Sequence, residues 1–183
     1  MTVTQRTNIR NGTRTAARKS VRPAAAQSVR APRWAVFGSL LTAAAGLGVS
    51  IYLTVAHYTA TVTLACPQTA TVNCEKVTSS PQSLFLGLPV AVLGVAYFAV
   101  MLLLCSPAAW RVSGPGPLGR LRWLRPLAAL GGVGFVAWLV YAELFIINAI
   151  CLWCTTVHVL TFILFGFVTL GAAAAVESSG GKD

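Results

Sequence analysis

Four long apolar stretches alternate with polar segments along the chain. The first runs from Ala35 to Ala56, 22 residues without a charge, and as a helix at ~1.5 Å per residue it would span about 33 Å. The others cover about 84–104, 127–148 and 155–176. A run of about 20 apolar residues is long enough to cross a bilayer as a helix. The pattern therefore predicts an all-α membrane protein, a bundle of four transmembrane helices.

Polar segments flank these stretches and divide the chain. Residues 1–33 form a basic arm that we expect to be disordered. Residues 34–176 form one four-helix membrane domain, and residues 177–183 form a short tail. The longest connection, Thr59–Ser83, is a polar loop between the first two spans. Since Pro89 is tolerated near a helix start, we expect residues 79–88 to form a short separate turn or half-helix at the membrane surface.

The placement of charge predicts the orientation. Hydrophobic residues make up 56% of the chain and charged residues only 10%, which favours a membrane protein over a soluble domain. Of the Lys and Arg residues, eight precede the first span, four lie between the second and third, one follows the fourth, and Lys76 lies in the polar loop. By the positive-inside rule, both termini and the middle connection are cytoplasmic, and the polar loop faces the periplasm or exterior of a bacterial plasma membrane.

The net charge of +10 raises the question of a polyanionic partner. No aromatic residue interleaves the basic arm before Trp34, so we expect no nucleic-acid binding. The arm could lie on anionic lipid or serve only to set the topology, and we favour the second interpretation.

Four cysteines fall on the outward side, where disulfides persist. Cys151 and Cys154 form a Cys-x-x-Cys motif just before the fourth span, and Cys66 and Cys74 lie eight residues apart in the polar loop. Unpaired amides at a helix N-terminus favour a thiolate, which suits the motif to redox chemistry. Inert packing or half of a metal site is the alternative for the motif, and a structural disulfide is the alternative for the loop pair. Two pairs at one depth favour exchange through a mixed disulfide.

Three runs around these cysteines resemble the vitamin K epoxide reductase family, in its bacterial, DsbB-like branch. The runs are Cys66-x7-Cys74-Glu-x-Val77-x-Ser79-Ser80-Pro81, Leu84-Phe-Leu-Gly87-Leu-Pro89 and Ala149-Ile-Cys151-Leu-Trp-Cys154-Thr-Thr-x-His158. The resemblance covers residues 35–175. It implies a four-helix bundle around a quinone, ubiquinone or menaquinone, and an oxidoreductase that acts on thiols with the quinone as acceptor.

The resemblance also implies a role for each cysteine. Cys154 would face the quinone, Cys151 would exchange with Cys74, and Cys66 would meet a DsbA-like thioredoxin-fold partner, which we expect to be a separate chain. The protein would re-oxidise that partner and so support disulfide formation in exported proteins. A quinone is a stronger oxidant than a protein disulfide, which favours this direction.

Further side chains are candidates for the quinone site. Ser80 matches a serine or threonine near the family's active site, and His158 lies one helical turn after Cys154, where it could contact a quinone carbonyl or bond a neighbouring helix. Trp153 and Phe85 could wall the pocket or simply pack in the core. Glu143 is the one acidic residue within a span, which marks it as a functional candidate. Its depth near the outer interface nevertheless favours simple solvation.

Two other functions are compatible with the same residues. The relay could run in reverse, as a thiol-driven reductase of quinones or vitamin K epoxide. Alternatively, the cysteines could be ligands in a non-catalytic, metal-binding membrane scaffold. We expect no metal, because the chain has no second Cys-x-x-Cys and no His-x3-His to complete a zinc site.

Overall fold

The computed structural model describes residues 32–59, 64–111 and 121–180. Apart from Pro32 and Arg33, the basic arm lies outside the described residues, as do residues 181–183 of the tail.

Helices dominate the described part of the chain. The long ones are α2 (Arg33–Tyr58), α6 (Leu121–Tyr141), which continues as the π-helix η3 (Ala142–Ile147), and α7 (Leu152–Gly180). Each contains an apolar segment long enough to cross a membrane, and α4 (Val90–Leu104) is a shorter apolar helix. The expected four-helix membrane bundle is thus confirmed.

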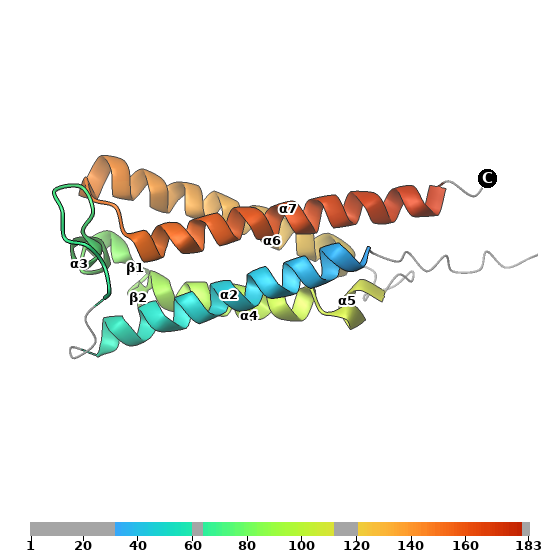
Figure 1. Cartoon of the computed structure of the whole chain (residues 1–183), viewed down its shortest axis with the longest axis horizontal. Helices are drawn as coiled ribbons and strands as arrows, with labels where there is room; N and C mark the ends of the chain where they lie inside the picture. Colours follow the sequence, from blue (N-terminus) through green and yellow to red (C-terminus); the bar gives the residue numbers. More distant parts are fainter. Residues whose placement is uncertain (1–31, 60–63, 112–120, 181–183) are drawn as a thin grey trace, which may run out of the picture.

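The four helices run lengthwise side by side, with α2 and α4 below α6 and α7 in the view of Figure 1. Helix α2 packs against both α4 and α7, and α6 packs chiefly against α7. Phe98, Met101, Leu164 and Val168 are fully buried between them. Gly46 lets α2 approach α4 closely, because a Cβ atom at this position would collide with the ring of Phe98.

A buried arginine closes the end of the bundle at which α7 ends. Arg125 is only 4% exposed, its Nε donates to the carbonyl of Leu104 at 2.8 Å, and its guanidinium lies 3.6 Å from the ring centroid of Trp110. Trp110 belongs to the short helix α5 (Pro107–Arg111). One cation therefore joins α4, α5 and α6.

Short elements cover the opposite end (Figure 1). They are helix α3 (Cys74–Thr78), the 3-10 turn η1 (Pro81–Ser83), and strands β1 (Leu84–Phe85) and β2 (Leu88–Pro89). The two strands pair antiparallel through a turn in which Leu86 and Gly87 have positive φ.

The second helix begins later than the expected start of the second span at Leu84. Helix α4 starts at Val90, directly after Pro89, because the residues before it pair as a hairpin. At ~1.5 Å per residue its 15 residues span about 22 Å, less than a ~30 Å hydrocarbon core.

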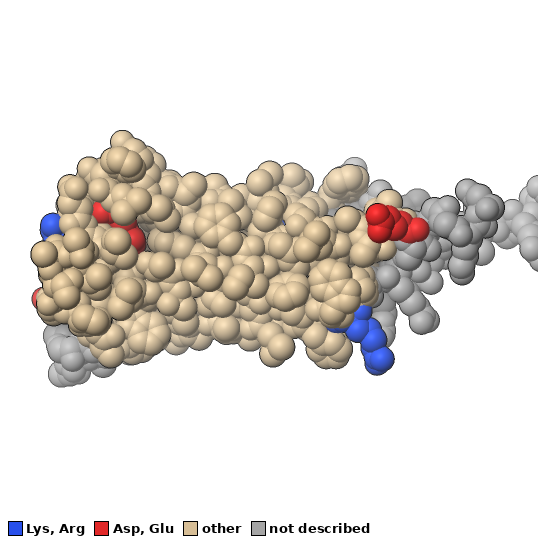
Figure 2. Space-filling view, turned by 45° about the horizontal axis from the view of Figure 1, so that its top comes forward, with Lys and Arg blue, Asp and Glu red and all other residues tan. Residues whose placement is uncertain are grey.

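On the face that Figure 2 shows, Lys, Arg, Asp and Glu lie near the two ends of the bundle. The long middle of this face carries no charged residue. This distribution is the one that a bilayer requires of a spanning bundle.

Candidate redox site

Cys151 lies at the N-terminus of helix α7. Asn148, in a left-handed conformation (φ 51°), ends η3, and α7 begins at Leu152. The backbone N–H of Cys154 donates to the sulfur of Cys151 at 3.3 Å, as the amide of a third helical residue does to an N-cap side chain. The hydrogen bond from the Cys154 thiol lowers the pKa of Cys151, although burial opposes the shift. Cys151 therefore forms a thiolate more readily than an ordinary cysteine does.

Backbone hydrogen bonds attach the polar loop to the same segment. The N–H of Ile150 donates to the carbonyl of Thr71 at 2.9 Å, and the N–H of Asn73 donates to the carbonyl of Ile150 at 3.1 Å. Asn73 in turn caps α3, its side chain accepting from the N–H of Lys76. The first residue of α3 is Cys74, so the cap and the loop pairing together fix the position of that cysteine.

Cys66, Cys74, Cys151 and Cys154 meet in one apolar cluster. Cys74 and Cys151, which are 1% and 0% exposed, form its centre with Val77 and Ala149, and Cys66 and Cys154 pack against it. Cys66 and Cys74 form a disulfide, whereas Cys151 and Cys154 are free thiols. The cluster therefore contains one oxidised and one reduced pair.

Trp153 holds the loop. Its indole N–H donates to the carbonyl of Ala65 at 3.1 Å, and its ring centroid lies 4.8 Å from that of Tyr52. The Tyr52 hydroxyl accepts from the N–H of Ala65. Trp153 is not among the residues that line the cavity described next, so the structure gives it a contact with the neighbour of Cys66 in place of the expected pocket wall.

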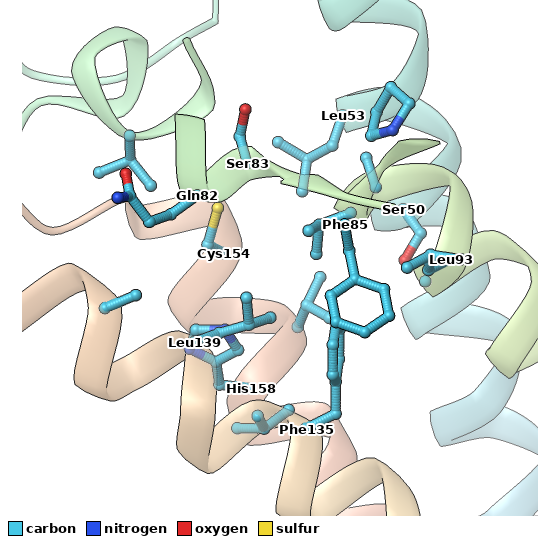
Figure 3. Close-up of a pocket in the computed structure, with 18 of the residues that line it drawn as sticks. Ser50, Leu53, Gln82, Ser83, Phe85, Leu93, Phe135, Leu139, Cys154 and His158 are labelled. Carbon is cyan, nitrogen blue, oxygen red and sulfur yellow. The ribbon is translucent and has the colours of Figure 1, made fainter. Parts of the chain in front are cut away.

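A cavity of about 460 Å³ opens beside Cys154. His158 lies one turn further along α7 in the cavity wall (Figure 3). Phe85 from β1 and Phe135 from α6 also line the cavity, and their rings meet edge to face with centroids 5.5 Å apart. Ser80 also lines it, and its hydroxyl donates to the carbonyl of Val77. Of the four clustered cysteines, Cys154 alone is among the lining residues.

Glu143 corrects an expectation from the sequence. The carboxyl group was expected to be solvated near the interface, but the residue is only 7% exposed and lines the same cavity. The amide of Cys151 faces its carboxylate. The π-helix that carries Glu143 is a local rearrangement often found at functional sites, and hydrophobic periodicity gives no signal for it.

Two more polar groups in the cavity wall were not singled out from the sequence. Gln82 comes from η1, and Tyr97 comes from the middle of α4. The hydroxyl of Tyr97 is buried and has no hydrogen-bond partner among the described residues. A buried polar atom of this kind usually has a partner, so Tyr97 is suited to bind a polar atom of a ligand. A tyrosine inside an apolar stretch carries no distinguishing signal in sequence.

Cys105 lies apart from the other four cysteines. It is fully buried in the central core between the helices, and burial raises the pKa of its thiol. A protonated, buried thiol behaves as a small apolar side chain. Within the described ranges, no group of three or more His, Cys, Asp or Glu residues is arranged to hold a metal ion.

The fold and the site define a multi-pass membrane protein with two cysteine redox pairs at one end of a helical bundle. The model of the vitamin K epoxide reductase family matches residues 38–169, more than half of the chain, and the chain belongs to this family. Enzymes of the family are thiol oxidoreductases that reduce quinones. A comparison with curated proteins gives no match.

Proposed function

We propose that this protein is a bacterial, DsbB-like thiol oxidase, which re-oxidises a DsbA-like thioredoxin-fold partner and passes the electrons to a membrane quinone. The observation that carries the proposal is the arrangement of the four cysteines. Both pairs share one buried cluster, and Cys154 alone among them also lines the cavity. Electrons can thus enter at the loop and leave at the cavity.

The proposed relay has three exchanges. A thiolate of the reduced partner attacks Cys66 of the loop disulfide, and the resulting mixed disulfide resolves to give an oxidised partner and a loop dithiol. Cys74 then attacks Cys151 of an oxidised Cys151–Cys154 pair, and Cys154 leaves as a thiol. Finally Cys66 attacks Cys74, which closes the loop disulfide and releases the Cys151 thiol. Cys151 and Cys154 are then both reduced.

The redox state of the cysteines fits one point in this cycle. A closed Cys66–Cys74 disulfide beside free Cys151 and Cys154 is the state that follows the last exchange. The electron pair then resides on the dithiol next to the cavity. The remaining step is oxidation of this dithiol.

The cavity fits a quinone. Its volume of about 460 Å³ lies within the range of small-molecule sites, and apolar side chains make up most of its wall. The unpaired hydroxyl of Tyr97 and the imidazole of His158 could bind ring oxygens, while Phe85 would pack against the ring. A bound quinone, menaquinone or ubiquinone, would supply a two-electron acceptor, and this chain would orient it toward Cys154.

We propose that the redox end faces the periplasm or exterior, with the membrane domain at 34–176 and both termini in the cytoplasm. Positive charge supports this orientation, since 13 of the 14 Lys and Arg residues precede the first span, lie between the second and third, or follow the fourth. Lys76, the exception, belongs to α3 at the redox end.

The direct test uses purified protein, a reduced DsbA-like substrate and a soluble menaquinone analogue. We expect stoichiometric loss of quinone absorbance and formation of the substrate's disulfide. Alanine at Cys66, Cys74, Cys151 or Cys154 should abolish this turnover, and Cys105→Ala should retain it. Full activity of Cys66→Ala would contradict the proposed order of exchange. Reduction of vitamin K epoxide by thiols, without oxidation of the substrate protein, would favour the reverse reaction.

A further inference from the structure

The buried carboxyl group of Glu143 has a position that the relay above does not use. It faces the backbone amide of Cys151, and it lies within electrostatic range of the sulfurs of both Cys151 and Cys154. It also lines the cavity that Cys154 opens onto. One side chain therefore adjoins the dithiol on one side and the proposed quinone site on the other.

Among the described residues, no Lys or Arg lines the cavity beside Glu143. The titratable groups around the same cavity are His57 of α2, Tyr97 of α4, and Cys154 and His158 of α7. Helix α3 contacts η3, and its charged residues, Glu75 and Lys76, are exposed. No Lys or Arg is hydrogen-bonded to the Glu143 side chain within the part of the chain that the structure describes. A structural ion pair therefore does not account for the burial of this carboxyl.

Oxidation of the dithiol requires that protons move as well as electrons. Formation of the Cys151–Cys154 disulfide releases two electrons and two protons, and conversion of a quinone to its hydroquinone takes up two of each. The electrons leave through sulfur. The protons need a group that can accept and release them inside a mostly apolar wall, and carboxylates are common in that role.

We propose that Glu143 is the proton carrier of the dithiol, accepting a proton from the Cys151–Cys154 pair and returning it on the cavity side. Each proton ends on the hydroquinone, and the carboxyl group is regenerated unchanged. The inference rests on the proposed function, since it assigns a residue to that reaction's last step. Glu143 is placed for it better than His158, because it adjoins the amide of Cys151 in addition to the cavity.

The test compares Glu143→Gln with Glu177→Gln, an exposed carboxyl at the far end of α7. Glutamine keeps an acceptor for the Cys151 amide but cannot exchange a proton. We expect oxidation of the Cys151–Cys154 dithiol by the menaquinone analogue, followed by stopped flow, to slow about 100-fold in Glu143→Gln. Glu177→Gln should match the wild type. Glu143→Asp, which keeps the titratable group, should recover part of the rate.

A second readout uses quinone-free protein. The pH dependence of Cys151 alkylation should shift to lower pH in Glu143→Gln, because the variant lacks a negative charge that disfavours the thiolate. If the carboxyl group only fills space and stays protonated, glutamine would mimic it. Neither the rate of dithiol oxidation nor the pH profile of Cys151 alkylation would then change. That result would overturn the inference and leave the proposed function intact. If the wild type fails to oxidise its dithiol with quinone, the proposed function falls, and an unchanged alkylation profile would overturn the role of Glu143 separately.

Discussion

The reactivity of the two cysteine classes follows from their immediate surroundings. Cys151 receives hydrogen bonds from the thiol and the backbone amide of Cys154, and these lower its pKa. Cys105 lies in the apolar core, and burial raises its pKa despite a hydrogen bond with Ser39 and the nearby charge of Arg125. The same type of side chain thus forms a thiolate more readily at Cys151 and behaves as a small apolar group at Cys105.

Alkylation rates should report this difference as a function of pH. Since only the thiolate reacts, the rate for Cys151 should reach half its maximum below the pH of an ordinary thiol, and the rate for Cys105 should do so above it. Iodoacetamide labelling of the wild type, resolved by tandem mass spectrometry, measures both residues in one sample. Denatured protein is the control, in which the two midpoints should converge. A higher midpoint for Cys151 than for Cys105 would contradict the assignment.

Some features of individual residues could be predicted from the sequence and others could not. The spacing of the cysteines and the motif around them were sufficient to single out the four sulfurs that share one cluster. The burial of Glu143 and the contact of Trp153 with Ala65 depend on how a loop folds over a helix end. Spacing along the chain contains no information on that packing.

Among the elements, the long helices were predictable because a bilayer imposes their length and apolar composition. The hairpin at 84–89 and the π-helix η3 were not. The hairpin consists of apolar residues that continue the pattern of the following helix, so hydrophobicity alone extends the span over it. Pro89 was the one local signal of a break, and α4 indeed starts directly after it.

Two glycines of α2 provide a matched test of helix packing. A Cβ atom at Gly46 would collide with the ring of Phe98, whereas nothing lies within 4 Å of one at Gly48. We expect Gly46→Ala to destabilise the bundle by about 1–3 kcal/mol through overpacking. Gly48→Ala should be neutral or stabilising by up to about 1 kcal/mol, because alanine is the better helix former.

Thermal unfolding in detergent measures both glycine variants against the wild type. A lower melting temperature for Gly46→Ala together with an equal or higher one for Gly48→Ala is the expected pattern. If both variants were equally stable, α2 and α4 would not approach each other as closely as described.

On the scale of the whole molecule, the two ends of the bundle differ in chemistry. One end holds the docked loop and the cysteine cluster, and the other holds Arg125 with its partners in α4 and α5. The cavity extends from the redox end into the bundle, since Cys154 at the start of α7 and Tyr97 in the middle of α4 both line it.

The proposed orientation can be tested with single cysteines in a variant that lacks the natural ones. Thr69 and Glu177 are both exposed, the first in the loop and the second near the end of α7. A membrane-impermeant maleimide should label Thr69→Cys in intact cells or spheroplasts and should label Glu177→Cys only after lysis. The reverse pattern would invert the topology and remove the case for an exported partner.

The most direct test of the central claim, a relay from the loop pair to the membrane pair, is thiol trapping of Cys154→Ala followed by mass analysis. In this variant Cys151 can still attack Cys74 of the loop disulfide, which frees Cys66. Alkylation of the freed Cys66 during trapping prevents its return, and Cys154 is absent, so no thiol remains to resolve the mixed disulfide. The relay predicts a stable Cys74–Cys151 disulfide with Cys66 free. A closed Cys66–Cys74 disulfide with Cys151 free in this variant would contradict it, and would identify the loop disulfide as a structural bond only.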